Sequence, residues 1–224
     1  MTMGAARGRL IVLEGGDGVG KTTQMPLVAD ALRARGLVVH TIREPGQTQV
    51  GQTVRALLLD PASRISPATE AMLFLAARAQ VVEEVVQPAL AAGEWVVADR
   101  FFVSTYAYQI AGHGLNDAQV RAANALATRG IVPDLTLLLT LSPTAATARR
   151  AGRGEADRLE RYGAEFDARV SQAYAASVTP VWQARHPECG PIVAVPGDGA
   201  VGAVTARVLT RIVEQIGVDA VLTG

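Results

Sequence analysis

A run of glycines that ends in lysine and threonine lies near the start of the chain. It reads Gly15-Gly16-Asp17-Gly18-Val19-Gly20-Lys21-Thr22-Thr23 and follows an apolar stretch. The run matches the pattern G-x-x-x-x-G-K-[S/T], whose glycines let successive backbone N–H groups point at phosphate oxygens. The lysine of such a loop reaches the β- and γ-phosphates, and the threonine hydroxyl ligates Mg²⁺. The run therefore predicts that the whole loop binds ATP, with Lys21 clamping phosphate and Thr22 holding the metal.

Lys21 is the only lysine in the chain; the rest of its 21 basic residues are arginine. A compact ammonium on a thin stem enters a narrow glycine loop more easily than a broad guanidinium does. Chance could also leave a single lysine, but its position in the loop favours the phosphate role. Asp17, an acid inside the same loop, has two interpretations of equal weight. It either contacts an acceptor hydroxyl or the hydrated metal, or it is a solvated loop residue.

Further polar residues follow the next apolar stretches. The second stretch is followed by Arg43, Glu44 and Pro45, and the third by Asp99 and Arg100. The segment 71–80 predicts a helix, with Phe74 and Arg78 four residues apart on one face. An aromatic ring with a guanidinium one turn away can stack on a base and hydrogen-bond its edge. Without other support, a core phenylalanine and a surface arginine would be the commoner interpretation.

Five apolar stretches rich in β-branched residues predict the strands that position these groups. They are Leu10–Leu13, Leu37–Ile42, Trp95–Ala98, Leu135–Leu141 and Ile192–Val195. Helical segments rich in Ala, Leu and Arg separate them, which indicates βαβ units and a parallel sheet covered on both faces. We therefore expect an α/β fold with five parallel strands and right-handed crossovers. Ligands bind beyond the carboxyl ends of such strands, where the candidate residues fall.

Composition restricts the classes of protein. The chain of 224 residues fits one domain, 1–224, and its formal net charge is zero, so no global field recruits nucleic acid or an anionic membrane. The single cysteine, Cys189, suits a reducing compartment. No apolar run is long enough to span a membrane, and the first residues lack the pattern of a signal peptide. We expect a cytoplasmic protein that binds neither nucleic acid nor membrane.

An arginine-rich segment follows the fourth predicted strand. It reads Arg149-Arg150-Ala151-Gly152-Arg153-Gly154-Glu155-Ala156-Asp157-Arg158. Glycines would allow this segment to move, and its arginines could close over ATP. Phosphoryl transfer spreads negative charge over the moving group, so cationic stabilisation is the main catalytic need. We expect a mobile lid at about 149–160, although a solvated charged helix is the alternative for such a run.

The ordered set of motifs resembles bacterial thymidylate kinases. The glycine loop, Arg-Glu-Pro-Gly, Phe-x-x-x-Arg, Asp-Arg and Ser-Thr-x-Ala-Tyr-Gln occur in that family's order, and the resemblance extends from about Leu10 to Ala175. It implies the three-layer fold of P-loop nucleoside monophosphate kinases, the substrates ATP and dTMP, Mg²⁺ as cofactor, and a homodimer. It also implies transfer of the γ-phosphoryl group of ATP to dTMP, giving dTDP and ADP.

The resemblance also implies roles for matching residues. On the acceptor side Phe74 would stack on thymine, Arg78 would bond the base's carbonyl edge, and Ser104 would help recognise the base. Arg100 would hold the acceptor phosphate, and Asp99 would support the metal. Tyr108 would pack on the deoxyribose and disfavour a 2′-hydroxyl. The other implied contacts are Arg43, Glu44 and Gln109 with the acceptor, Pro45 fixing the turn, Arg149 with ATP, and Arg153 as the catalytic arginine, a role that Arg149 or Arg158 could share.

Three positions depart from the family's usual pattern. Gln47 and Ile110 stand where glycine is usual, and His113 stands where arginine is usual. Two of them lie near the expected acceptor site, so base preference is the property they would affect. Because the acceptor is already a phosphate anion, no general base is required. His40, His113 and His186 are therefore expected to be ordinary surface or loop residues.

Two other functions remain as alternatives. A P-loop kinase could act on another nucleoside monophosphate or on a small molecule that is not a nucleotide. A nucleotide-dependent switch is the second alternative, but guanine-specific switches use Asn-Lys-x-Asp. Neither Asn116 nor Asn124, the only asparagines, precedes a lysine. An enzyme is the better interpretation.

Overall fold

A five-stranded parallel sheet forms the centre of the protein. The structure is a computed structural model that describes residues 7–142, 145 and 158–217. The strands are β1 (Leu10–Glu14), β2 (Val39–Arg43), β3 (Trp95–Asp99), β4 (Leu135–Thr140) and β5 (Ile192–Pro196), and their order is β2-β3-β1-β4-β5. All neighbouring pairs are parallel. The predicted α/β fold with five parallel strands is confirmed, and each strand lies within two residues of its predicted bounds at either end.

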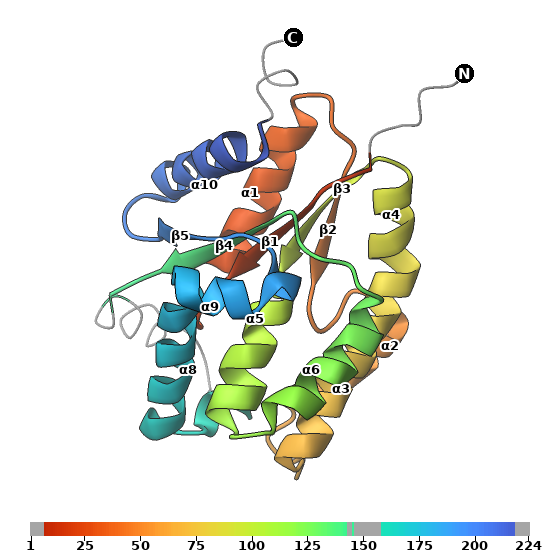
Figure 1. Cartoon of the computed structure of the whole chain (residues 1–224), viewed down its shortest axis with the longest axis vertical. Helices are drawn as coiled ribbons and strands as arrows, with labels where there is room; N and C mark the ends of the chain where they lie inside the picture. Colours follow the sequence, from red (N-terminus) through yellow and green to blue (C-terminus); the bar gives the residue numbers. More distant parts are fainter. Residues whose placement is uncertain (1–6, 143–144, 146–157, 218–224) are drawn as a thin grey trace.

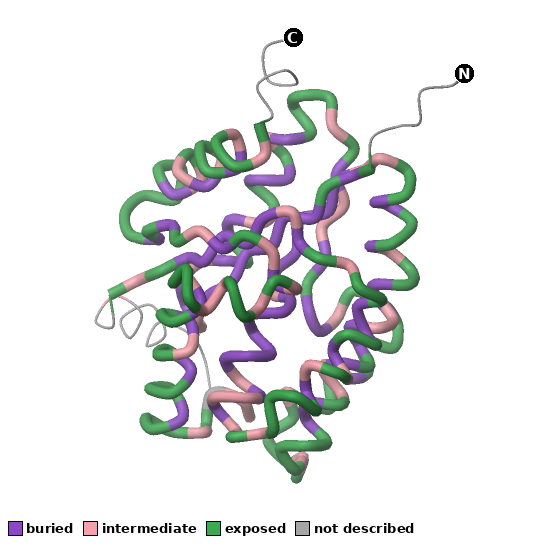
Figure 2. The backbone as a smooth tube through the Cα atoms, in the orientation of Figure 1, coloured by how far each residue is buried: buried purple, intermediate pink, exposed green. Residues whose placement is uncertain are grey.

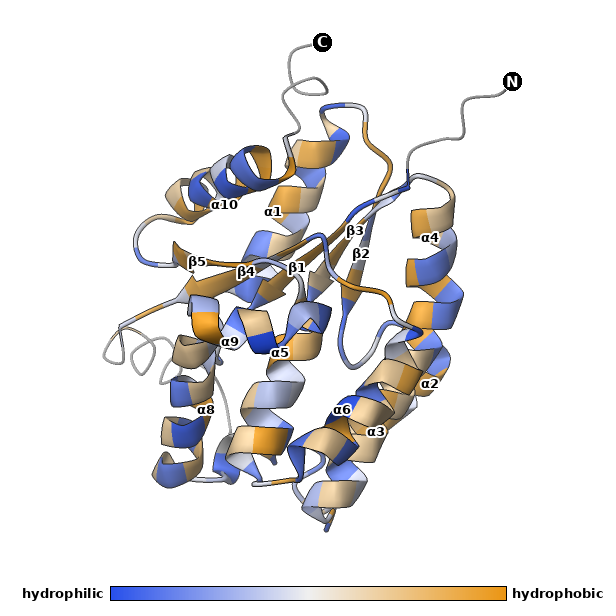
Figure 3. Ribbon diagram, in the orientation of Figure 1, coloured by the Kyte–Doolittle hydropathy of each residue, from blue (hydrophilic) through white to orange (hydrophobic). Residues whose placement is uncertain are grey.

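Side chains of the central strand alternate between two cores, one on each face of the sheet. Leu10 and Val12 belong to the first core, whereas Ile11 and Leu13 belong to the second. All four are fully buried, as Figure 2 shows for the strands as a group. A parallel strand covered on both faces needs apolar residues at every position. This is why the central strands β1, β3 and β4 lack a polar alternation, and the strands as a group are strongly hydrophobic in Figure 3.

Two helices cover the second core. These are α1 (Lys21–Arg33), which follows the glycine loop, and the amphipathic α10 (Val201–Ile216) near the end of the described chain. Val28, Ala29 and Leu32 of α1 meet Val204 and Val208 of α10 in this core. The two helices lie side by side on one face of the sheet (Figure 1). Because α1 begins at Lys21, this packing fixes the end of the helix that faces the glycine loop.

The opposite face carries most of the other described helices. These are α3 (Pro67–Val81), η1 (Val82–Val86), α4 (Gln87–Ala91), α5 (Phe102–Ser104), η2 (Thr105–Gly112), α8 (Ala164–Ser177) and α9 (Pro180–Arg185), with the short turn η4 (Pro187–Cys189). Phe101, Tyr106 and Phe166 are among the aromatic residues buried there. The segment η2 is a π-helix and continues directly from α5. It carries Tyr108 and Gln109 away from the end of β3.

A group of helices extends beyond the carboxyl edge of the sheet, in the lower half of Figure 1. It comprises α2 (Gln49–Leu59), α3, α6 (Asp117–Thr128) and the ends of η2 and α8. The turn η3 (Leu159–Arg161) precedes α8. The helix predicted at 71–80 is confirmed and lies inside α3, which Ser66 caps by accepting from Thr69 N at 3.3 Å. Among the described helices, none has the length and apolar character needed to cross a membrane.

Candidate active site

The glycine loop closes around the start of α1 as the motif predicts. Gly15, Gly18 and Gly20 have positive φ angles of 132°, 85° and 105°. A Cβ atom on Gly15 would lie 2.4 Å from Leu139 O, so β4 leaves room only for glycine there. The first N–H groups of a helix lack partners within it and attract anions. The loop and α1 therefore form a phosphate-binding end of the pocket.

Lys21 lies within this loop with its ammonium group turned back onto the loop. Its Nζ donates to Gly15 O and Gly16 O, both at 2.8 Å, and the side chain is buried. Burial, followed by the positive charge of Arg100, lowers the pKa of Lys21 from its ordinary value of 10.5 to about 8. Phosphate oxygens would supply the negative charge that this buried cation lacks. Lys21 is thus prepared to bind an anion.

Thr22 and Asp99 meet beside the loop. Asp99 ends β3 and is paired in register with Leu13 of β1, so it lies next to the loop that follows β1. Thr22 Oγ1 donates to Asp99 Oδ2 at 2.9 Å. Two oxygen ligands at this point fit Mg²⁺, which usually keeps several waters and takes few protein ligands. Among the described residues, no group of three or more acidic, histidine or cysteine side chains is placed to hold a metal ion.

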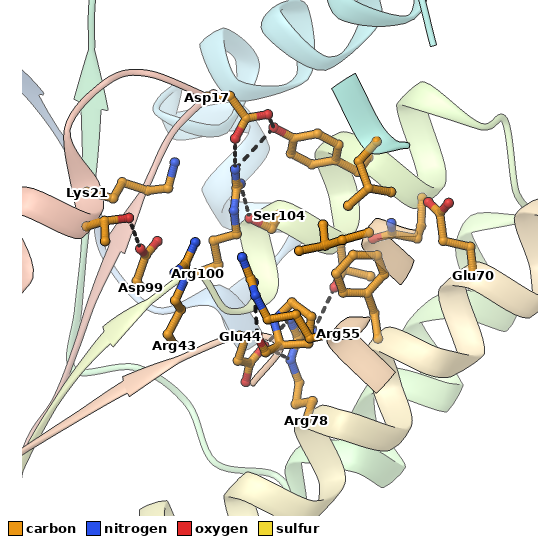
Figure 4. Close-up of a pocket in the computed structure, with 18 of the residues that line it drawn as sticks. Asp17, Lys21, Arg43, Glu44, Arg55, Glu70, Arg78, Asp99, Arg100 and Ser104 are labelled. Carbon is orange, nitrogen blue, oxygen red and sulfur yellow. Dashed lines mark hydrogen bonds and ion pairs between the residues drawn. The ribbon is translucent and has the colours of Figure 1, made fainter. Parts of the chain in front are cut away.

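Arg100 occupies the middle of the pocket. Its backbone has φ 73°, a value rare for residues other than glycine, and its guanidinium makes an ion pair with Asp17 at 2.5 Å. The same guanidinium lies 5.0 Å above the ring of Tyr108, whose hydroxyl donates to Asp17 Oδ2 at 3.1 Å. Asp17 therefore contacts two residues that the family resemblance assigns to the acceptor side, and Figure 4 shows its pair with Arg100. Of the two interpretations of Asp17, this geometry favours the one in which it faces the acceptor.

Glu14 is a buried acid beside the site that the sequence analysis missed. It ends β1, is fully buried, and its Oε1 accepts from the backbone N–H groups of Phe101 and Ser104 at 2.9 and 3.0 Å. Its Oε2 accepts from Ser104 Oγ at 2.7 Å and from Tyr174 Oη at 3.2 Å. These bonds fix the backbone on both sides of Phe101, immediately after the unusual φ of Arg100. The sequence did contain an indication of this residue, because Glu14 is an acid at the end of an otherwise apolar strand.

Arg78 is buried within a polar network behind the pocket. Its Nε donates to Glu44 Oε2 at 2.7 Å, and its other nitrogens donate to Thr105, Asn124 and the Phe101 carbonyl, each at 2.7 Å. Burial outweighs the attraction of Arg78 and raises the pKa of Glu44. Arg78 also borders the pocket. Its Nη2 also lies 2.6 Å from Glu44 Oε2. A bond to a base would therefore have to share or replace one of these contacts, so the predicted base contact of Arg78 stays a proposal.

Phe74 stands one turn before Arg78 and faces the same pocket. It is partly buried, as is Leu159, which also borders the pocket. Gln109 is buried and borders the pocket as well. On the side of β2, Arg43 and Arg55 point into the pocket (Figure 4), and Arg55 Nη1 donates to Pro45 O at 3.1 Å. The Glu44–Pro45 peptide bond is cis.

Most of the predicted site residues line one pocket. They are Asp17, Gly18, Gly20, Lys21, Thr22, Thr23, Arg43, Glu44, Pro45, Phe74, Arg78, Asp99, Arg100, Ser104, Tyr108 and Gln109. Gly15, Gly16 and Val19 belong to the glycine loop but not to the pocket lining. Arg149 and Arg153 lie outside the described residues, as does the predicted lid apart from 158–160. The lining also includes residues that were not predicted: Arg55, Leu59, Glu70, Thr105 and Leu159.

The expectation for His113 is wrong, because this histidine is neither on the surface nor free in a loop. Only 7% of its side chain is exposed, and Nε2 lies 2.9 Å from Glu70 Oε1. The partner lies 43 residues earlier in the chain, so sequence spacing gave no sign of it. His40 pairs with Glu94 on the surface, with 42% of its side chain exposed, as expected. His186 is partly buried and stacks on Trp182.

A parallel sheet, a phosphate loop after its central strand, and an arginine–aspartate pair across the same pocket define a P-loop phosphotransferase. Comparison with known proteins identifies its family. The sequence profile described as thymidylate kinase matches residues 13–182, which is most of the chain. The chain belongs to the thymidylate kinase family.

Curated relatives and a solved structure agree with this assignment. Thymidylate kinase of Synechococcus sp. (strain RCC307) is 49% identical over 185 residues, which cover 79% of this chain and 87% of that protein. Thymidylate kinase of Caldanaerobacter subterraneus subsp. tengcongensis is 44% identical over 168 residues, covering 75% and 80%. The crystal structure of thymidylate kinase from Ehrlichia chaffeensis superposes with a TM-score of 0.72 at 25% identity, covering 92% of this chain and 99% of that one. The predicted family and P-loop NTPase fold are confirmed.

Proposed function

We propose that this protein transfers the γ-phosphoryl group of ATP to dTMP, forming dTDP and ADP. The proposal rests on one observation: in a chain of this family, one pocket is lined both by the glycine loop and by the residues predicted to bind the acceptor. One end of the pocket is the glycine loop with Lys21, and the other is lined by Phe74, Tyr108 and Gln109. Arg100 lies between the two ends. A pocket with a phosphate clamp and a separate acceptor side fits a kinase better than a switch.

The donor side binds and orients the triphosphate. Lys21 exchanges the carbonyl oxygens of Gly15 and Gly16 for phosphate oxygens, and the N-terminus of α1 adds N–H donors. Thr22 and Asp99 are the residues that would hold Mg²⁺, which neutralises charge on the β- and γ-phosphates when it is bound. These residues therefore place the γ-phosphorus facing the acceptor side.

The acceptor side positions a nucleophile that is already ionised. Arg100 would hold the phosphate of dTMP close to the donor phosphate, so catalysis needs charge neutralisation and positioning rather than a base. Asp17 now bonds Arg100 and Tyr108, and it could accept from a sugar hydroxyl at the same place. Tyr108 would then pack against the deoxyribose and crowd a 2′-hydroxyl. Phe74 would stack on thymine, with Ser104 and Arg78 behind it.

Three parts of the proposal rest on the sequence. Arg153 supplies the cationic charge near the transferred group, and Arg149 contacts ATP; both belong to the arginine-rich segment at 149–160. The protein acts as a homodimer, as expected from the family resemblance. It works in the cytoplasm, where dTMP and ATP are its partners.

The activity is tested by incubating purified protein with ATP, Mg²⁺ and dTMP and separating the products by ion-exchange chromatography. We expect dTDP and ADP to appear in equal amounts. Lys21→Met provides the control, and it should remove dTDP formation because the phosphates lose their clamp. ATP hydrolysis without dTDP, or a rate that does not depend on dTMP, would refute the proposed acceptor.

A further inference from the structure

We propose that Glu70 is a positioning residue for the acceptor nucleotide, because it fixes the pocket wall formed by Phe74 and Leu159. The inference deepens the proposed function and rests on it. Glu70 lies in the first turn of α3, four residues before Phe74 and therefore on the same face of the helix. It is 1% exposed and borders the pocket. No phosphate role requires an acid at this end, which Figure 4 places opposite Lys21.

Three side chains from two separate segments converge on the Glu70 carboxylate. His113, directly after η2, lies with Nε2 2.9 Å from Oε1. Arg158 Nη2 donates to Oε2 at 2.6 Å, and the Tyr162 hydroxyl also donates to Oε2. Burial alone would raise the pKa of Glu70, but the hydrogen bonds from His113, Tyr162 and Arg158 outweigh it and lower the pKa. Glu70 is therefore ionised and only accepts, so His113 Nε2 carries a proton.

Arg158 anchors the turn that carries Leu159. Its Nε donates to Leu58 O at 2.8 Å, its Nη1 to Tyr162 Oη at 2.7 Å, and its Nη2 to Glu70. The guanidinium thus ties the turn to the end of α2 and to the start of α3. Burial opposes its charge, but the hydrogen bond and charge of Glu70 raise the pKa of Arg158. The alternative that Arg158 shares the catalytic role does not fit this geometry, because its guanidinium already bonds Leu58 O, Tyr162 and Glu70.

An aromatic cluster supports the network from behind. The ring centroid of His113 lies 4.8 Å from that of Tyr162 and 4.9 Å from that of Phe166. The centroids of Tyr162 and Phe166 are 4.5 Å apart. Phe166 also packs against Tyr108, the residue proposed to face the sugar, with 6.2 Å between the two ring centroids. The hydroxyl of Tyr162 stays protonated, since burial and the bond to Glu70 raise its pKa to about 12. Loss of the carboxylate would therefore loosen contacts to both the base and the sugar.

The charge explains why an acid is needed at this position. Arg158 is 11% exposed, so without Glu70 a nearly buried cation would lose its charged partner. The turn that carries Leu159 would then move toward solvent to hydrate Arg158, and the pocket wall to which Leu159 contributes would open. This change lies at the acceptor end of the pocket. The affinity for dTMP should therefore fall, while the affinity of the glycine loop for ATP should stay the same.

The test compares Glu70→Gln with a matched control, Glu94→Gln, in the full-length protein. Glu94 is the acid of a histidine pair like that of Glu70, but it lies on the surface, 32% exposed. We expect Glu70→Gln to raise KM for dTMP about tenfold or more, with KM for ATP within about twofold and kcat within about threefold. Glu94→Gln should leave all three unchanged. If the wild type turns over dTMP normally and Glu70→Gln has an unchanged KM for dTMP, this inference is overturned but the proposed function is not. If the wild type does not turn over dTMP, the proposed function itself is overturned.

A double-mutant cycle separates positioning from catalysis. Arg158→Gln should also raise KM for dTMP, and the Glu70→Gln/Arg158→Gln protein should be little worse than either single variant, because all act through one network. A large loss of kcat at unchanged KM for dTMP in Arg158→Gln would place Arg158 on the transferred phosphate and refute the proposal. If Glu70→Gln does not fold, Tyr162→Phe serves instead: it removes one donor to Glu70 and should raise KM for dTMP by about twofold to fivefold. An unchanged KM in a folded Tyr162→Phe protein would count against the network.

Discussion

The lone lysine allows a direct measurement of how the empty phosphate loop is prepared for its ligand. Burial and the charge of Arg100 lower the pKa of Lys21 from 10.5 to about 8. One pKa unit corresponds to about 1.4 kcal/mol, so the buried charge costs about 3 kcal/mol in the protein without nucleotide. Bound phosphates would remove that cost by supplying opposite charge. Removal of this desolvation cost therefore contributes to the affinity for ATP.

The sign of the effect on stability follows from proton binding. Below pH 8 both the folded and the unfolded state keep the proton on Lys21, and the folded state carries the full cost. Between pH 8 and 10.5 the folded state loses the proton while the unfolded state keeps it, so this group makes stability rise with pH. Lys21→Met should therefore lack the rise in the free energy of unfolding, about 3 kcal/mol between pH 8 and 10.5, that this group gives the wild type. Urea denaturation at several pH values measures it.

Nuclear magnetic resonance measures the pKa itself. Protein labelled with ¹³C at the lysine ε-carbon gives one signal, because the chain has one lysine, and no assignment is needed. We expect a titration midpoint of about 8 without nucleotide and a midpoint above about 10 with ATP, since phosphates favour the charged form. The urea-unfolded protein is the control, with a midpoint near 10.5. A midpoint near 10.5 in the folded, empty protein would refute the reasoning.

Three other predictions concern single side chains. Arg153→Ala should lower kcat by about 10³-fold with KM for ATP within about threefold, as steady-state kinetics would show; normal turnover would assign the charge to another residue. Glu14→Gln should lower the free energy of unfolding by about 2–4 kcal/mol in urea denaturation, since an amide NH₂ would face the hydroxyls of Ser104 and Tyr174. The thiol of Cys189 is fully buried, and burial raises its pKa, so a disulfide reagent should react with it far more slowly in the native than in the unfolded protein; equal rates would mean that it is accessible.

The fold could be predicted from the sequence because its signals are local. The central strands β1, β3 and β4 consist almost entirely of apolar residues, because burial on both faces of a parallel sheet favours such runs. The start of the second strand was placed at Leu37, whereas β2 begins at Val39. Leu37 and Val38 continue the apolar pattern but precede the ladder that begins with Val39 and Trp95. Hydrophobicity alone does not tell where a ladder begins.

The phosphate half of the site was predictable for a similar reason. The glycine loop is contiguous, and its spacing alone predicts roles for Lys21 and Thr22. The order of the later motifs also placed Asp99 and Arg100 correctly at the pocket. Backbone geometry restricts which residues can form such a loop, so its function can be recognised in a single sequence.

The residues that sequence reasoning missed are held by distant partners. Glu14 bonds Ser104 and Tyr174, and Glu70 receives donors from η2 and from the turn before α8. Nothing in the local sequence shows these partners. His113 was misjudged for the same reason, because its acid lies on another helix. A buried acid becomes recognisable only when the fold brings its donors together.

The most direct test of the account is a competition for a limiting amount of ATP. Equal concentrations of dTMP, dUMP and dCMP are mixed with the protein, Mg²⁺ and a small amount of [γ-³³P]ATP, and the labelled diphosphates are separated. The account predicts that labelled dTDP exceeds each other product by about tenfold or more, since one methyl group in an apolar pocket is worth 10- to 200-fold. A mixture dominated by dUDP or dCDP would contradict the assignment of thymidylate as the acceptor.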